Sequence, residues 1–193
     1  MKRRSPQIKA LHPLFVVFFA VAIISAVAHY SGQPKSVSPA PKAALSQLSG
    51  QTVRSRVVRI YDGDTIKLAN GEKVRFIGID APELHDNPKL YRDARRLGLD
   101  VDTIKSMGEE AYEFSKNLLA DKDVTLEFDV QPRDKYGRLL AYVYLDDGTF
   151  VNEEIVKNGY AYLMTIPPNV KRAADFKALF EQARARKLGL WRK

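Results

Sequence analysis

Residues 53–80 carry the pattern that decides the fold, and they read VRSRVVRIYDGDTIKLANGEKVRFIGID. Val53–Tyr61, Thr65–Leu68 and Lys73–Ile79 are rich in β-branched residues, which favour the extended backbone of a strand. Asn70-Gly71 lies between the last two segments and is typical of a two-residue hairpin turn. The sequence therefore predicts three strands that follow one another through short turns.

The chain after residue 80 predicts helices and two further strands. Gly108–Ala120 and Ala173–Lys187 have apolar residues at helical spacing, and Glu153–Gly159 is typical of a short helix ended by glycine. Apolar residues alternate in Asp123–Val130, and Leu139–Leu145 completes the strands. This order predicts an α+β fold, a five-stranded, partly open OB-type β-barrel with about three helices, rather than a doubly wound sheet. The side chains expected to face the core are Ala111, Phe114, Leu118, Leu119, Val124, Leu126, Phe128, Val130, Phe176, Leu179, Phe180 and Ala183.

An apolar segment precedes this domain. Leu14–Ala28 is apolar apart from Ser25 and follows a basic head, which is typical of an export signal or a membrane anchor. A 15-residue helix spans roughly 22 Å, less than the ~30 Å of a bilayer core, and Ala26-Val27-Ala28 suits a signal peptidase. These features favour a cleaved signal peptide. A helix from Leu11 to Tyr30 would cross the bilayer, so an uncleaved N-terminal hydrophobic anchor is the alternative. Either way we expect export across the cytoplasmic membrane, to a secreted, periplasmic or anchored state.

The composition divides the chain into three parts. Residues 1–28 are the predicted signal or anchor, residues 29–51 have the Pro, Ser and Ala content of a flexible linker, and residues 52–193 form the predicted domain. Six of the 31 basic residues and none of the 23 acidic residues lie in residues 1–50, so the rest carries a net charge of only +2. Overall charge is therefore weak evidence for a nucleic-acid partner. The absence of cysteine excludes disulfides, thiolate zinc sites and cysteine nucleophiles.

Two acidic motifs lie at strand ends. Asp62-Gly63-Asp64-Thr65 joins the first two predicted strands, and Asp80-Ala81-Pro82-Glu83 ends the third. Taken singly, each motif is also typical of a turn or a strand end. Neighbouring strands of one hairpin can nevertheless bring Asp64 and Asp80 to the same end of a sheet. Two carboxylates and a backbone carbonyl, completed by water, suit a hard cation such as calcium.

Two arginines accompany these carboxylates. Arg75 precedes Asp80 on the same predicted strand, and their odd separation puts the two side chains on opposite faces. A bend must therefore intervene if both serve one site. Arg138 closes the turn Arg133–Arg138 before the last strand, a segment that also suits a solvated hairpin tip.

The chain from Arg56 to Trp191 resembles the thermonuclease (staphylococcal nuclease) family. Single motifs are weak, but several in order with compatible gaps are specific. The matching stretches are Asp62-Gly63-Asp64-Thr65, Arg75, Asp80-Ala81-Pro82-Glu83, Asp134-Lys135-Tyr136-Gly137-Arg138, Leu140-Ala141-Tyr142-Val143-Tyr144, Val151-Asn152-Glu153 and Lys187-Leu188-Gly189-Leu190-Trp191.

The resemblance implies Ca²⁺-dependent hydrolysis of DNA and RNA, leaving 3′-phosphate and 5′-hydroxyl ends. It implies that the arginine and the carboxylate share one site on a curved barrel, and that the enzyme acts as a monomer without an obligate protein partner. The residues it assigns are Asp64, Asp80 and the Ala81 carbonyl for the metal, Arg75, Glu83 and Arg138 for catalysis, Lys135 and Tyr136 for a terminal phosphate of the substrate, and Asp62 for support of the metal ligands. Glu83 is expected to act as general base or to orient the attacking water.

The chain departs from the family pattern in two places. Leu84–Met107 is roughly a dozen residues longer than expected, the length of a functional or disordered loop. Its arginines (Arg92, Arg95 and Arg96) suit either a nucleic-acid backbone or a solvated loop. The family's base-stacking tyrosine pair does not map without a gap, so Tyr162 suits either stacking or core packing.

Two other classes of function compete with an enzyme. One is a catalytically inactive OB-type module that binds nucleic acid, and the other is a barrel that binds an envelope ligand. The near-neutral charge of the domain favours the latter. The joint presence of the metal carboxylates, Glu83 and both arginines favours the nuclease, because a binding module has no need of Glu83.

Overall fold

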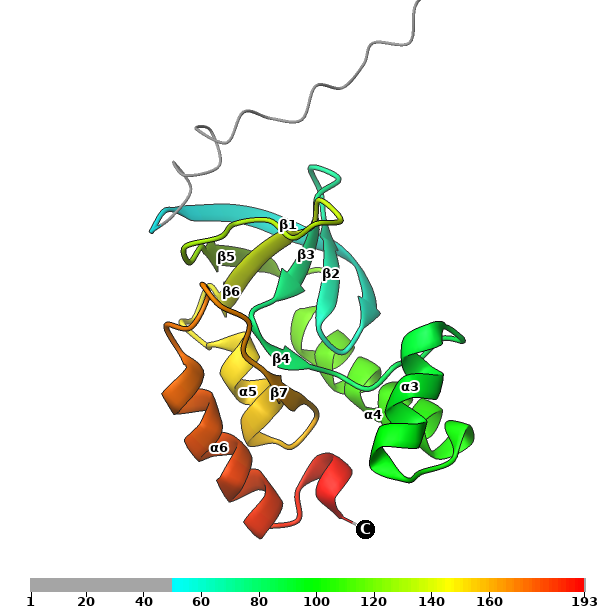
Figure 1. The fold of residues 1–193 in the computed structure, drawn as a ribbon. Coiled ribbons are helices and arrows are strands. Elements are labelled where there is room, and N and C mark those ends of the chain that lie inside the picture. The colour runs from blue at the N-terminus through cyan, green and yellow to red at the C-terminus, as the bar shows by residue number, and fades with distance from the viewer. Residues whose placement is uncertain (1–49, 193) are drawn as a thin grey trace, which may run out of the picture. The chain divides into compact units, whose positions relative to one another are not determined.

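The computed structural model describes residues 50–192, and within them five strands close into a mixed β-barrel (Figure 1). The strand order is β1-β2-β3-β6-β5, in which β3 and β6 run parallel and the other described pairs run antiparallel. The barrel is closed, whereas the sequence predicted a partly open one. The barrel strands are β1 (Thr52–Asp62), β2 (Thr65–Leu68), β3 (Lys73–Phe76), β5 (Asp123–Glu127) and β6 (Leu139–Leu145).

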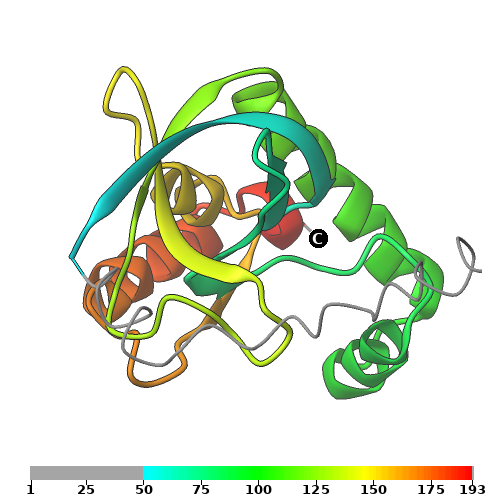
Figure 2. The same cartoon turned by 90° about the horizontal axis from the view of Figure 1, so that it is seen from above.

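The remaining elements pack around the barrel. Figure 2 shows β1 curving along the barrel with α4 beside it, and α5 and α6 lie together on another side. A separate two-stranded sheet joins β4 to β7. These elements are β4 (Gly78–Asp80), α3 (Pro88–Leu97), α4 (Val101–Leu119), α5 (Val151–Lys157), β7 (Tyr162–Met164), α6 (Ala173–Ala185) and the 3₁₀ turn η1 (Gly189–Trp191).

The predicted N-terminal segments lie outside the described residues. The apolar helix and all but the last two residues of the linker fall within residues 1–49. Within residues 50–192, no helix combines the length and the apolar character needed to cross a membrane.

The predicted loop Leu84–Met107 is largely helical. It contains α3 and the first turns of α4, so residues 50–192 hold four α-helices rather than about three. Asn87 begins α3, because its side chain accepts hydrogen bonds from the backbone N–H groups of Lys89 and Leu90 at 2.8 and 3.0 Å. Gly98 ends the helix with a φ of 66°. These caps were readable signals that the loop prediction overlooked.

The core fills the barrel and continues under α4, α5 and α6. The predicted inward residues are buried or packed against this core, with the exception of Val130, whose exposed fraction is 57%. The prediction for Val130 was wrong because β5 ends at Glu127 and the strand alternation ends with it. Instead, the neighbouring Asp129 turns inward and accepts a hydrogen bond of 3.0 Å from the Tyr142 hydroxyl.

The predicted strand Lys73–Ile79 is broken in two. β3 pairs with β2 and β6 in the barrel, whereas β4 leaves the barrel to pair with β7. Gly78 stands just after the break with a φ of 84°, a backbone conformation that glycine adopts readily. The buried amide of Asn152 holds the break, because it donates to the Ile77 carbonyl at 3.0 Å and accepts from the Val143 N–H at 2.9 Å. This break is the bend that the sequence analysis called for if the side chains of Arg75 and Asp80 are to reach one site.

Replacing Gly78 by alanine should destabilise the fold by about 3 kcal/mol, from a strained positive φ and an overpacked contact. A Cβ there would lie 2.4 Å from the Phe176 ring. Gly71→Ala is the matched control, because Gly71 has a φ of 89° but open space around it. Its loss should be about 1 kcal/mol. Urea unfolding of both variants measures the difference, and equal losses would show that the Phe176 contact does not matter.

Candidate active site

Two buried carboxylates meet on one guanidinium at the end of the barrel. Asp64 follows β1 in the turn before β2, and Asp80 is the last residue of β4. Arg75 projects from β3 between them, with Nη1 2.8 Å from Asp64 Oδ2 and Nη2 2.8 Å from Asp80 Oδ1. The exposed fraction of each acidic residue is 4%. The β1–β2 turn, β3 and β4 thus place their functional residues at one point.

Helix α4 supports both acidic segments through small residues. A Cβ on Gly63 would lie 2.7 Å from the Ala81 Cβ and 2.9 Å from the Ala111 Cβ, so the turn fits tightly between them. The buried Ser115 hydroxyl donates to the Gly63 carbonyl at 2.7 Å. Gly108 of α4 packs equally closely against the Glu83 backbone, since a Cβ added at Gly108 would lie 2.6 Å from the Glu83 carbonyl oxygen. Larger residues here would push the carboxylates apart.

The acidic pair is short of positive charge. Burial raises the pKa of Asp64 to about 7, and the Arg75 charge only partly opposes this effect. Burial also raises the pKa of Asp80, against the charges of Arg75 and Lys89. A carboxylate with a raised pKa gains from any nearby cation. The site therefore favours more positive charge than Arg75 and Lys89 together supply.

The neighbouring backbone is organised around Asp64. The Ala81 N–H donates to Asp64 Oδ2, and the Asp62 carboxylate accepts a hydrogen bond of 3.0 Å from the Asp64 N–H. Asp62 therefore shapes the turn that presents Asp64. Within residues 50–192, no three His, Cys or acidic side chains converge as a metal cluster, so a cation here would rest on two side chains and on backbone or water oxygens.

Glu83 lies beside this pair and is held by residues that the sequence analysis missed. Lys89, at the start of α3, lies 3.0 Å from Glu83 Oε1, 3.3 Å from Asp80 Oδ2 and 2.9 Å from Asp93 Oδ2. Asn87 donates a hydrogen bond of 2.6 Å to the other Glu83 oxygen. Asn87-Pro88-Lys89 has the sequence of a helix start, which could have indicated that Lys89 is held on a helix near Glu83. The prediction of a loop for Leu84–Met107 passed over this pattern.

Arg138 reaches the site from the turn before β6. Its Nε donates to Asp134 Oδ2 at 2.7 Å, and Asp134 Oδ1 accepts from the N–H groups of Tyr136 and Arg138. Arg133 anchors this turn with a two-pronged ion pair to Glu72, at 2.6 and 2.8 Å. The Arg138 head is thus oriented through Nε, which leaves its two terminal nitrogens for a ligand.

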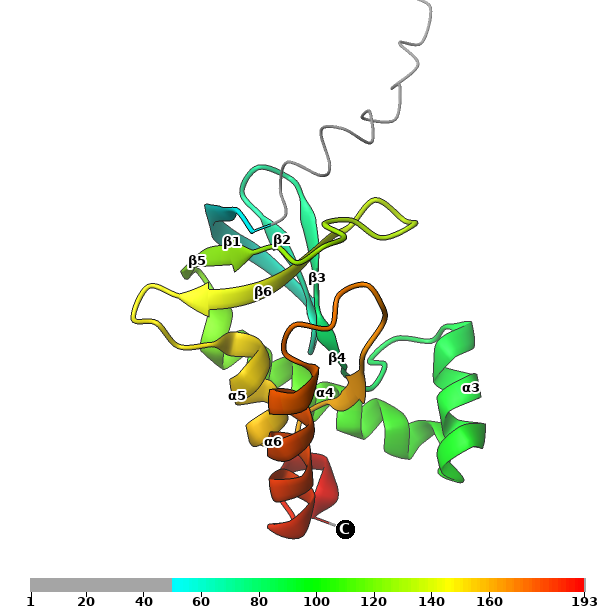
Figure 3. The same cartoon turned by 60° about the vertical axis from the view of Figure 1, so that its left-hand side comes forward.

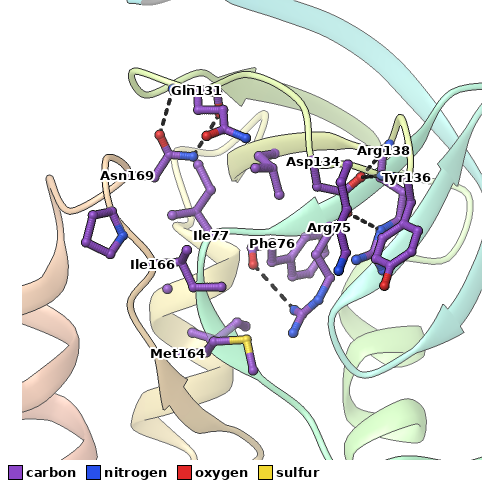
Figure 4. A pocket seen from close by; sticks show the side chains of 15 residues that line it. Arg75, Phe76, Ile77, Gln131, Asp134, Tyr136, Arg138, Met164, Ile166 and Asn169 are labelled. Atoms are coloured by element: carbon purple, nitrogen blue, oxygen red, sulfur yellow. Dashed lines mark hydrogen bonds and ion pairs between the residues drawn. The ribbon is translucent and has the colours of Figure 1, made fainter. Parts of the chain in front are cut away.

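Two adjoining cavities contain all nine predicted site residues. The first, of about 210 Å³, is lined by Asp62, Asp64, Thr65, Arg75, Asp80, Ala81, Pro82, Glu83, Lys89, Arg92, Arg138 and Met164. The second, of about 390 Å³, is mostly apolar away from the arginines and includes Lys135, Tyr136, Ile77 and Ile166 (Figure 4). Arg75, Arg138 and Met164 line both cavities, so the two arginines stand at their boundary. Tyr136 is largely exposed, with the Lys135 Nζ 5.0 Å from the centre of its ring.

Neither Tyr162 nor His85 lines these two cavities. Tyr162 is half-buried in β7, with its ring edge-on to Trp191 at a centroid distance of 5.4 Å. Tyr162 thus packs against Trp191, and it is also the strand partner of Asp80 in the β4–β7 pair. His85 is exposed and lines a different groove, beside Tyr112 and Lys116 of α4.

Known proteins share this sequence pattern. A comparison with family models matches residues 73–193 to the family described as "Staphylococcal nuclease homologue". The thermonuclease of Staphylococcus hyicus is 35% identical over 156 residues, which cover 79% of this chain and 83% of that protein. The thermonuclease of Staphylococcus intermedius is 36% identical over 138 residues, covering 70% of this chain and 74% of that protein. Endonuclease YhcR of Bacillus subtilis is 34% identical over 160 residues, and this chain spans only 12% of that longer protein.

Proposed function

This chain belongs to the staphylococcal nuclease family, and from that premise we propose that it is a nuclease that hydrolyses the phosphodiester bonds of DNA and RNA. Relatives named thermonuclease and endonuclease support this activity. The observation that carries the proposal is the cavity in which Arg75 and Arg138 stand beside Asp64, Asp80 and Glu83. A cavity with two guanidinium groups suits a phosphate, and one with buried carboxylates suits a cation.

The arginines bind and polarise the phosphate. When water attacks phosphorus and the bond to the 5′ oxygen breaks, negative charge grows on the non-bridging phosphate oxygens. The forked head of Arg138 stabilises that charge with two-pronged hydrogen bonds, while Arg75, whose terminal nitrogens pair with Asp64 and Asp80, contributes its positive charge from beside them. Because Asp134 already orients Arg138, little rearrangement is needed at the moment of reaction. The products are a 3′-phosphate and a 5′-hydroxyl.

Glu83 activates or orients the attacking water. Asn87 and Lys89 hold one oxygen each of its carboxylate at the edge of the cavity. From that position Glu83 accepts a proton from the water or orients it toward phosphorus. Lys135 and Tyr136, on the exposed turn, contact a terminal phosphate of the substrate.

A calcium ion fits the acidic pair. Asp64 and Asp80 would hold it, with the Ala81 carbonyl and water completing an all-oxygen set. The raised pKa of both carboxyls supports this assignment, because burial has left the pair short of positive charge. When bound, calcium supplies a fixed positive charge beside the phosphate oxygens.

The alternative function is a catalytically inactive OB-type module for nucleic acid or an envelope ligand. Within this alternative, the net charge of only +2 outside residues 1–50 favours an envelope ligand over nucleic acid. Such a module would bind its ligand without breaking bonds. An assay of cleavage therefore separates the two functions.

Cleavage of plasmid DNA and of RNA should require calcium. The protein should degrade both substrates with calcium and neither with a chelator, and the new 5′ ends should accept phosphate from a polynucleotide kinase without prior dephosphorylation. Glu83→Gln should lower turnover far more than calcium affinity, which calorimetry measures. Cleavage both with calcium and with the chelator, or in neither reaction, contradicts the calcium mechanism. If Glu83→Gln lowers turnover and calcium affinity equally, Glu83 is chiefly a metal ligand.

Arg138→Lys should lower kcat by about 100-fold, because a lysine keeps the charge but loses the forked donor that Asp134 orients. Folding should persist, as judged by an unchanged urea midpoint. Arg54→Lys is the matched control, since Arg54 is an exposed residue of β1 paired with Asp146. Normal turnover of Arg138→Lys would remove Arg138 from the catalytic set.

We further propose that the N-terminal segment exports the nuclease domain, either as a cleaved signal peptide or as a membrane anchor. The basic head, the apolar run Leu14–Ala28 and Ala26-Val27-Ala28 support this localisation. The sequence of the mature N terminus should begin at or soon after residue 29 if the signal is cleaved. Recovery of the uncleaved chain from the cytosol, outside the membrane fraction, would contradict export.

A further inference from the structure

Helix α3 is a packed element with its own small core. Leu90 and Ala94 are buried against Ile104 and Met107 of α4 and against Leu190. Figures 1 and 3 show α3 beside the first turns of α4, away from the barrel. A helix capped at both ends and packed along one side holds its outer side chains in defined positions.

The face of α3 toward the active site is basic. Lys89, Arg92 and Arg96 follow one another at separations of three and four residues, which places them on one stripe of a helix. Lys89 and Arg92 line the active-site cavity together with Arg75 and Arg138. The stripe therefore continues the phosphate-binding arginines outward from the barrel.

Ion pairs within the stripe distinguish Arg92 from its neighbours. Asp93 is buried and contacts Lys89 at 2.9 Å and Arg96 at 3.2 Å, which fixes both. Arg92 has no ion pair closer than 4.0 Å among the described residues, and 64% of its side chain is exposed. Its guanidinium head is thus the one on this stripe that has the least engagement with the protein.

We propose that α3 is a second phosphate-binding element, in which Arg92, with Arg96 beyond it, binds the backbone of the substrate strand beside the phosphate that is cleaved. This inference rests on the proposed nuclease function. The phosphates of a polynucleotide strand follow one another closely, so a strand with one phosphate at Arg75 and Arg138 presents the next ones to the cavity wall. Arginine suits this task because its fork matches two phosphate oxygens. The consequence is a preference for polymers over minimal substrates.

Two comparisons test the role of Arg92. The first measures kcat/KM with calcium on a single-stranded oligonucleotide of about 12 nucleotides, within the site size of an OB fold, and on a thymidine phosphodiester with a p-nitrophenyl leaving group. Arg92→Ala should lower the ratio of the oligonucleotide value to the diester value by about tenfold, the loss of one charge-assisted contact. Arg92→Lys should recover part of it. Arg95→Ala is the matched control, because Arg95 is an exposed arginine of α3 that does not line the cavity. Its ratio should equal that of the natural protein.

The second comparison measures binding without turnover. Fluorescence anisotropy with the same oligonucleotide in a chelator gives the dependence of log K on log salt. Arg92→Ala should reduce this slope by about 0.7, the value of one phosphate contact on a single strand, whereas Arg95→Ala should leave it unchanged.

The outcomes separate this inference from the proposed function. If the natural protein cleaves neither substrate, the nuclease proposal fails, and the salt slope alone decides whether Arg92 contacts phosphate. If it cleaves both, and Arg92→Ala changes neither the ratio of kcat/KM values nor the salt slope, then α3 does not contact the substrate and this inference is overturned. An equal loss on both substrates also overturns it, because Arg92 would then act on the scissile phosphate itself. Circular dichroism of each variant confirms that α3 is retained.

Discussion

The ion-pair bridge from Arg75 to Asp64 and Asp80 is the constraint around which the rest of the structure is arranged. Buried charges are tolerated only when they are paired, and leaving one unpaired costs about 3–5 kcal/mol. The bridge joins the β1–β2 turn, β3 and β4, so these three segments must end at the same point. Lys89 adds a second cation 3.3 Å from Asp80 Oδ2, and burial still raises the pKa of both carboxyl groups.

Two features of the fold satisfy this constraint, the break between β3 and β4 and the close packing of α4 against the acidic segments. Gly78 and the Asn152 amide let β4 leave the barrel, so that Asp80 faces Arg75 although their separation of five positions is odd. Helix α4 then approaches both acidic segments through glycine and alanine, which lack the bulk to keep them apart. The stable parts of the fold thus hold the charged groups, while the exposed Tyr136 turn remains free to meet a ligand.

The distribution of charge matters more than its sum. Outside residues 1–50 the chain is nearly neutral, yet Arg75 and Arg138 line one cavity with Lys89 and Arg92. For the proposed function, guanidinium groups gathered in one cavity serve a phosphate better than a uniformly basic surface does, because their charge lies where the substrate charge develops. The inserted helix α3 extends this arrangement and shields one side of the carboxylates.

Signals within single segments predicted most of the local elements, and the acidic and arginine motifs predicted the residues of the candidate site. Alternation, helical spacing and Asn70-Gly71 are short-range signals, so they predicted all five barrel strands and the helices after residue 107. The loop prediction for Leu84–Met107 failed because the Asn87 and Gly98 caps were overlooked, and Val130 failed because alternation does not mark where a strand ends. Only the tertiary structure decided that Asp64, Arg75 and Asp80 converge and that Lys89 holds Glu83. Those contacts depend on pairing between segments distant along the chain and on the bend at Gly78, and no periodicity within one segment encodes either.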